Sequence, residues 1–122
     1  MGLNYGVVEQ CGNSETDHGY ATDAGGIVGW NYGMIRNCWN TGMVTGTGVG
    51  GIAGVNQAGA EIENCWFTGS MTGGDPGGIV SQNLSGATVR NCYSIYSCPV
   101  RVDEGTVVDV ESKTNAQFVN GN

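Results

Sequence analysis

The sequence predicts an all-β chain folded as a parallel β-solenoid of about four coils, with three short strands in each coil. Three observations support this prediction: one phrase recurs in tandem, four cysteines recur every 27 residues, and glycine interrupts every stretch that could form a helix. A unit this short cannot bury its apolar side alone, whereas stacked copies form a continuous core. The copies of the phrase are Gly25–Gly42, Gly50–Gly69 and Gly77–Ser94, with a partial copy in Gly2–Cys11.

The strands are expected in short apolar or alternating runs that lie between turn residues. In the first complete repeat these runs are Gly26–Gly29, Met34–Trp39 and Met43–Thr45. Glycine, asparagine and Thr-Gly pairs flank the runs, and these residues favour turns and positive φ. Helices are disfavoured because each internal glycine costs a helix about 1 kcal/mol.

Length varies between the predicted strands and not within them. The first glycine of the Gly-Gly pair always lies six residues before an asparagine, but the step from that asparagine to the cysteine is seven residues in two copies and nine in two. Changes elsewhere compensate, which is typical of solenoids because stacked strands keep their register while corners absorb insertions. The cysteines predicted to form a column are Cys11, Cys38, Cys65 and Cys92.

The charges two residues before each cysteine alternate in sign. Stacking in register would place them in one column at a spacing of about 4.8 Å, where every neighbour is attractive. Exposed pairs of this kind contribute at most about 1 kcal/mol each, so their main effect is to oppose a shift in register. This predicted charge ladder consists of Glu9, Arg36, Glu63 and Arg90.

Other side chains are expected to form columns of their own. Strict alternation would place Cys38 on the outside beside Arg36, but a bend at Asn37 would turn the thiol inward. We favour the bend because free cysteine is among the most often buried residue types. The predicted columns are apolar (Val8, Ile35, Ile62 and Val89; Ile27, Ile52 and Ile79), aromatic (Trp39, Trp66 and Tyr93) and a corner ladder of bonded amides (Asn37, Asn64 and Asn91).

The repeat pattern decays after Cys92. We therefore assign residues 1–98 to the solenoid repeats and residues 99–122 to a C-terminal cap or the start of a linker. A terminal coil exposes unpaired strand edges, which must be covered or blunted. The chain begins inside a repeat, so we expect it to be covalently part of a larger multidomain protein.

The composition disfavours several classes of partner. The chain has 4 Lys and Arg against 11 Asp and Glu, which gives a net charge of -7. An acidic surface repels phosphate backbones, so we expect no nucleic-acid binding. No apolar run approaches the roughly 20 residues of a membrane-spanning helix, and we expect no direct membrane insertion.

No residues stand out as a catalytic or metal site, and we predict no cofactor. The cysteines lack the Cys-x-x-Cys spacing of structural zinc sites, and the only histidine is His18, in a divergent turn. A column of buried thiols is favoured, but disulfides between stacked cysteines stay open because Cα atoms about 4.8 Å apart fall inside the allowed range. Cys98 could bridge to Cys92 or stay free.

Three weaker patterns each have a plainer interpretation. Paired carboxylates on one strand face suggest acid–base chemistry, but a solvated face fits them better. Equivalent threonines suggest ordered water, but two per column favour a turn or strand role. Acidic residues near glycine-rich turns suggest calcium, but the motif Asp-x-Asp-x-Asp is absent. The paired carboxylates are Glu61 and Glu63, the equivalent threonines are Thr41 with Thr68 and Thr45 with Thr72, and the acidic residues near turns are Asp17, Asp23 and Asp75.

The phrase Gly-Gly-Ile-Val-Gly-x-Asn-x-Gly-x-Ile-x-Asn-Cys, followed by Thr-Gly-x-Val-x-Gly, closely resembles the GLUG repeat of bacterial surface proteins. The resemblance is most specific in Gly25–Gly46 and Gly50–Gly73, whereas Ser81 departs from the glycine of the pattern. It implies an accessory region of a large secreted or wall-attached bacterial protein, with no catalytic residues. A cell-surface location would also make oxidation of the cysteines more plausible.

We therefore expect a non-enzymatic module that acts as a stalk, a spacer or an adhesin. Flat solenoid faces suit binding of a glycan or of a host or cell-surface protein. One alternative is a fragment of a carbohydrate-active β-solenoid enzyme, which would require a cleft with clustered acidic and basic side chains. A further alternative is an ice- or surface-binding solenoid, which would require longer threonine columns.

Overall fold

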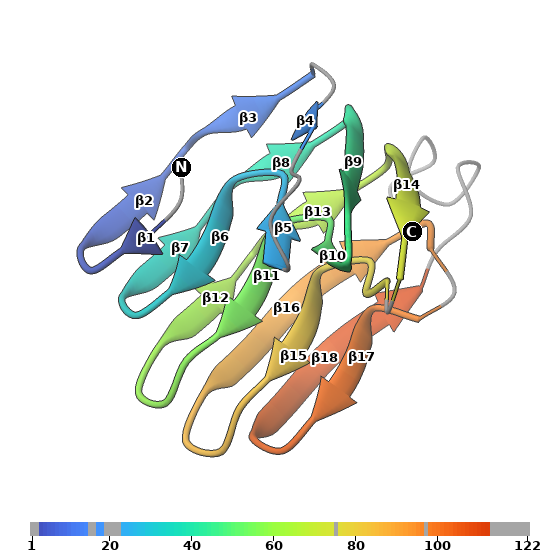
Figure 1. The fold of residues 1–122 in the computed structure, drawn as a ribbon. Coiled ribbons are helices and arrows are strands. Elements are labelled where there is room, and N and C mark those ends of the chain that lie inside the picture. The colour runs from blue at the N-terminus through green and yellow to red at the C-terminus, as the bar shows by residue number, and fades with distance from the viewer. Residues whose placement is uncertain (1–2, 15–16, 19–22, 75, 97, 113–122) are drawn as a thin grey trace.

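The computed structural model describes residues 3–14, 17–18, 23–74, 76–96 and 98–112. These residues form short β-strands that coil around a common axis, so that each turn lies beside the one before it (Figure 1). Every strand pair among them is parallel. Within these ranges there is no helix, and hence none long and apolar enough to cross a membrane.

The first sheet has five strands, one from each passage of the chain. Asn4 lies beside Asn31, and Asn31 lies beside Asn56. The fifth strand joins in the same parallel sense beyond the fourth. In order, the strands are β1 (Leu3–Asn4), β6 (Val28–Asn31), β11 (Ala53–Asn56), β15 (Val80–Asn83) and β17 (Val100–Asp103).

The second sheet follows the first after a tight corner and is bent along its length. Its longest strands carry both halves of the bend, whereas the other coils divide the same run into two strands. The first half contains β2 (Val7–Glu9), β7 (Met34–Arg36) and β12 (Glu61–Glu63). The second half contains β3 (Gly12–Asn13), β8 (Trp39–Asn40) and β13 (Trp66–Phe67), and both halves meet β16 (Thr88–Ser94), which pairs with β18 (Thr106–Ser112).

Two smaller sheets complete each turn. An isolated β-bridge between Gly50 and Gly77 continues the two-stranded sheet into the next coil. The three-stranded sheet contains β4 (Asp17–His18), β9 (Met43–Gly46) and β14 (Ser70–Gly73), and the two-stranded sheet contains β5 (Asp23–Gly25) and β10 (Gly48–Gly50).

The described chain makes about three complete turns and part of another, which confirms the predicted parallel β-solenoid. The sequence analysis expected three strands in each coil, whereas the turn from β6 to β10 has five. One predicted run is divided at Asn37, whose φ of 55° interrupts the extended backbone. The segment Gly48–Gly50 also forms a strand that the sequence analysis did not foresee, because glycines mask its pairing.

The core contains the two predicted apolar columns, further valines, three cysteines and one aromatic side chain. Ile35 lies between Val8 and Ile62 in register, and Ile62 lies beside Val89, as predicted. Phe67 is the largest fully buried side chain. The fully buried members of the two columns are Ile35, Ile62, Val89, Ile52 and Ile79.

The Gly-Gly pair of each repeat is required by close packing at the end of a turn. A Cβ atom at Gly51 would clash with the carbonyl oxygen of Gly78 and with the ring of Phe67. A Cβ atom at Gly50 would clash with the backbone of Ala53. Glycine is therefore needed at both positions, because no larger residue fits without moving the backbone.

The corners absorb the differences in length, as predicted. In the shorter turns the amide of Tyr32 bonds to the carbonyl of Asn4 at 2.8 Å. In the longer ones Ala60 bonds back to Gln57 at 2.9 Å, and Gly59 has a φ of 83°. The two extra residues form a local turn that leaves the strands on either side in register.

The strands of residues 100–112 extend the parallel stacking beyond the last full repeat. Val100 pairs with Val80, and Thr106 pairs with Thr88. Whether residues 99–122 form a cap or begin a linker stays a prediction. Asp75, residues 113–122 and the side chains of Asp17, His18 and Asp23 lie outside the described residues, and so do the expectations about them.

Candidate functional site

A ladder of buried amides runs along the corner between the first and second sheets. Each Nδ2 atom donates to the Oδ1 atom one coil further on: Asn4 to Asn31, Asn31 to Asn56 and Asn56 to Asn83, all at 2.9 Å. The last three are fully buried. The ladder ends at Asp103, whose Oδ1 accepts from Asn83 at 3.0 Å. All its bonds therefore point in one direction along the solenoid.

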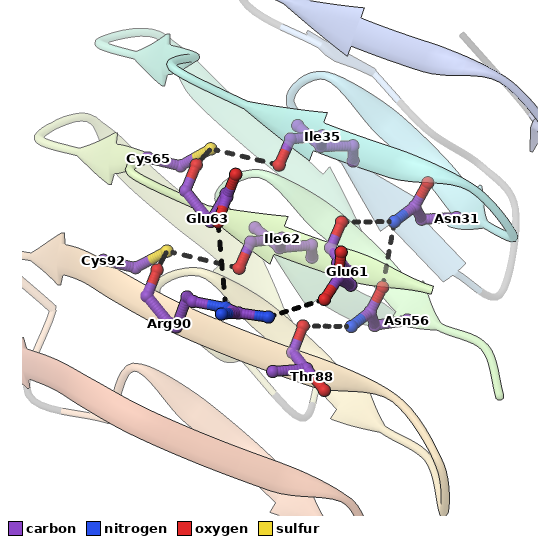
Figure 2. A network of polar contacts seen from close by, with 10 residues as sticks. All are labelled: Asn31, Ile35, Asn56, Glu61, Ile62, Glu63, Cys65, Thr88, Arg90 and Cys92. Atoms are coloured by element: carbon purple, nitrogen blue, oxygen red, sulfur yellow. Dashed lines mark hydrogen bonds and ion pairs between the residues drawn. The ribbon is translucent and has the colours of Figure 1, made fainter. Parts of the chain in front are cut away.

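The same amides also hold the backbone of two coils. Asn31 donates to the carbonyl of Glu61 at 3.1 Å, and Asn56 donates to that of Thr88 at 3.0 Å (Figure 2). The Oδ1 of Asn31 accepts from the amide of Gly33, two residues on. Asn31 thus closes its own corner and binds the next coil, which satisfies its donors and acceptors away from water.

The predicted position of the amide ladder was wrong. Asn37, Asn64 and Asn91 are exposed, and the described residues show no bond between their side chains. They have φ values of 55°, 54° and 52°, a left-handed conformation that asparagine tolerates better than most residues. The signal that could have located the ladder was the invariant six-residue spacing from the Gly-Gly pair to Asn31 and Asn56.

The left-handed residues turn the cysteines toward the core. Cys38, Cys65 and Cys92 are fully buried, whereas Cys11 is exposed in the first coil. The thiol of Cys65 lies 3.2 Å from the carbonyl oxygen of Glu63 and 4.0 Å from that of Ile35 in the preceding coil (Figure 2). All five cysteines, Cys98 included, are free thiols in the structure.

The interior suppresses ionisation of Cys38 and Cys65. The neighbouring Cys65 thiol and burial raise the pKa of Cys38 far above its ordinary value. Cys38 lowers the pKa of Cys65, but Cys92 and burial raise it more, and the net result is a pKa of about 12. The thiolate is the reactive form, so these side chains are packing groups rather than nucleophiles at neutral pH.

The charged column consists of separate ion pairs rather than one continuous ladder. Arg36 Nε lies 2.8 Å from Glu9 Oε2, and Arg90 Nε lies 3.7 Å from Glu63 Oε2. Glu63 also lies beside Arg36 in register, but no ion pair joins these two residues. The expectation that every neighbour attracts therefore differs from the structure at this one step.

Glu61 is a partner of the charged column that the sequence analysis missed. Its Oε1 lies 2.6 Å from Arg90, diagonally across the sheet from its register partner Thr88 (Figure 2). Glu61 and Glu63 therefore both face the Arg90 guanidinium. A charge-assisted contact of this kind neutralises the two carboxylates locally and leaves them poorly arranged as an acid–base pair.

Two groups of aromatic side chains lie on the surface. Trp39 stacks on Trp66 with centroids 6.0 Å apart and planes 17° apart, and Tyr93 follows in register. Tyr5 stacks on Tyr32 with centroids 4.7 Å apart and planes 9° apart.

The ring centroids of Trp30 and Tyr32 lie 6.2 Å apart, and the two ring planes are inclined by 55°. We call Tyr5, Trp30 and Tyr32 the corner aromatic cluster. Tyr5 is 72% exposed and Trp30 is 38% exposed, so the cluster offers both apolar ring surface and polar tips to solvent.

The threonines that the structure describes lie in equivalent positions of neighbouring coils. Thr45 and Thr72 lie side by side in β9 and β14. Thr41 and Thr68 each donate a backbone amide to the preceding coil. Among the residues that the structure describes, no group of three His, Cys, Asp or Glu side chains could hold a metal ion.

Comparison with known families identifies the repeat. Residues 45–72 match the family model of the GLUG motif. This segment runs from Thr45 to its own register partner Thr72, which makes it one full turn of the solenoid. No curated protein and no solved structure was found to match the chain. The chain therefore contains a GLUG motif, and this motif forms one turn of the parallel β-solenoid.

Proposed function

We propose that the chain is a non-enzymatic module of a bacterial cell-surface protein, where it serves as a spacer and as an adhesin that binds a glycan. The observation that carries the spacer role is the amide ladder. It joins each coil to the next through buried side-chain bonds, so that adding repeats adds length without a flexible joint. Such a module separates other domains at a defined distance.

The charges of the described residues favour a module without catalysis. The best-placed carboxylates, Glu61 and Glu63, both bind Arg90, and the raised pKa values of Cys38 and Cys65 keep these two thiols protonated. A carbohydrate-active enzyme would need an acid and a base free to reach a glycosidic bond. The GLUG motif at residues 45–72 supports the interpretation as a repeat module, and the surface location rests on the resemblance of the repeats to those of surface proteins.

The corner aromatic cluster supports glycan binding. The apolar C–H faces of sugar rings pack on exposed indole and phenol rings, while tyrosine hydroxyls bond to sugar hydroxyls. Trp30 and Tyr32 lie at an angle of 55°, so together they present two walls rather than one flat surface. The acidic net charge of -7 favours neutral glycans over anionic ones.

A glycan array followed by calorimetry tests this proposal. We expect the full chain to bind a neutral glycan and Trp30→Ala to lose most of the affinity. Trp39→Ala is the matched control, because Trp39 is 37% exposed and stacked but lies in the other aromatic group. Circular dichroism would check that both variants keep the fold.

Four outcomes would contradict parts of the proposal. Equal loss of binding in both variants, or no glycan bound at all, would rule out the corner aromatic cluster as an adhesin site. Release of new reducing ends from a polysaccharide would contradict the non-enzymatic assignment. Absence of the protein from the cell surface in antibody labelling of intact producing cells would contradict the proposed location.

A further inference from the structure

We propose that the two ends of the solenoid differ in their ability to stack against a further coil. The Asn4 end accepts a further coil of the same repeat, whereas Asp103 closes the other end to such a coil. The partner that fits the Asn4 end is a strand with a corner asparagine, whose Nδ2 points at Asn4. This inference concerns assembly and is independent of glycan binding.

The direction of the amide ladder makes its ends unequal. Every amide donates toward the C-terminal end and accepts from the N-terminal end. At the first rung, Asn4 donates to Asn31 and Met34, while among the described residues its Oδ1 accepts one bond, from the backbone of Gly6. A carbonyl oxygen has two lone pairs, so it has room for one more donor from a preceding coil.

At the last rung the donor is missing. Asp103 Oδ1 accepts from Asn83 and from the amide of Gly105, both at 3.0 Å. A carboxylate has no hydrogen to pass on, so it cannot continue the series. A further coil would place its own amide oxygen against Asp103 and would bury a charge that is now exposed, and both effects oppose stacking.

Two other columns end at the same place. The charged column begins at Glu9, but beyond Arg90 its next position is Val108. The residue directly after each ladder position forms another column. This column begins with the stacked pair Tyr5 and Tyr32 in the first two coils and ends with Glu104 in the last.

Apolar surface is exposed at both ends, at Val7 and at Val108, and therefore does not distinguish them. The polar pattern alone sets the direction.

The experiment compares self-association of the full-length wild-type chain, Asp103→Asn and Asp109→Asn by sedimentation over a range of concentrations. Asp103→Asn restores a donor that can meet Asn4 of a second copy. Asp109→Asn is the matched control, because it removes the same charge from β18 at an exposed site whose φ of 53° suits asparagine. We expect Asp103→Asn to associate at least about tenfold more strongly than either, which corresponds to about 1.4 kcal/mol.

Mixing tests the direction. A wild-type chain offers an Asn4 end but a closed Asp103 end, so it should join an Asp103→Asn assembly and terminate it. We therefore expect added wild-type protein to shorten these assemblies in proportion to its amount. Association of Asp103→Asn no stronger than that of Asp109→Asn, including no association by either, would overturn the proposal. Assemblies that the wild type does not shorten would overturn it as well.

Discussion

The amide ladder and the charged column are both built from one side chain per coil, yet they differ in almost every physical respect. The amides of Asn31, Asn56 and Asn83 are fully buried and bonded in unbroken succession. The charged side chains are half exposed and form separate pairs, with a gap between Arg36 and Glu63.

The difference follows from the surroundings of each column. A buried amide without partners is costly, so the fold must supply every bond. An exposed charge has water as an alternative partner, so a missing contact costs little. A repeated pattern in the sequence thus predicts a column without revealing how much stability the column provides.

The largest expected effect is the loss of one rung of the amide ladder. Asn56→Ala would remove the partner of Asn83 and Thr88 inside the protein. We expect the free energy of unfolding to fall by about 3 kcal/mol, because each orphaned buried group costs about 1–3 kcal/mol. Urea denaturation followed by circular dichroism measures this value.

Gln57→Ala is the control for that variant. Gln57 is the next amide side chain and is only partly buried, so its loss should change stability by less than about 0.5 kcal/mol. Equal effects of the two variants would mean that the buried ladder does not stabilise the fold.

The buried thiols make the stability of the fold depend on pH. The pKa of Cys65 is about 12 in the fold against an ordinary value of 9.0. Above pH 9 the unfolded thiol loses its proton while the folded one keeps it, so the native state binds more protons and stability falls as pH rises toward 12. We expect Cys65 to contribute up to about 1.4 kcal/mol per pH unit in this window.

Denaturation midpoints between pH 8 and pH 11 would measure that slope. Cys65→Ala should show a shallower decline than the wild type, because one of the titrating thiols is gone. Cys11→Ala is the control, since Cys11 is exposed. Identical slopes in all three proteins would contradict a buried, protonated column.

A smaller effect is expected at the bend that separates the outer arginines from the inner cysteines. Asn64 has a φ of 54°, where a side chain with an ordinary Cβ costs roughly 1–2 kcal/mol. Asn64→Ala should therefore destabilise the fold by about 1 kcal/mol, and Asn64→Gly should recover most of the loss. Thermal denaturation would compare them, and a glycine variant less stable than the alanine variant would disprove this explanation.

The smallest effects are expected in the charged column. Arg90→Gln, which breaks contacts to two glutamates, should cost less than about 1 kcal/mol, and Arg36→Gln, which breaks one, should cost less still. Both losses should shrink in 1 M salt, where screening acts over about 3 Å. A loss at Arg90 that equals that of Asn56→Ala and persists in salt would remove the distinction between the two columns.

The sequence determined the period of this protein. Spacings of 27 residues fixed which residues become neighbours, so the register of Ile35 with Ile62 and of Trp39 with Trp66 was predictable. The resemblance of the repeats to the GLUG motif was likewise visible from the residues alone, and the family model matches residues 45–72.

The tertiary structure decided which side each column faces and what it bonds to. Asn31 and Asn37 are both asparagines at repeating positions, and only the backbone places the first inside a corner and the second on the outside. The contact of Glu61 with Arg90 crosses the sheet diagonally, which a linear alignment of repeats does not display. Periodicity is a one-dimensional property of the chain, whereas burial and hydrogen-bond direction depend on how a few left-handed residues turn it in space.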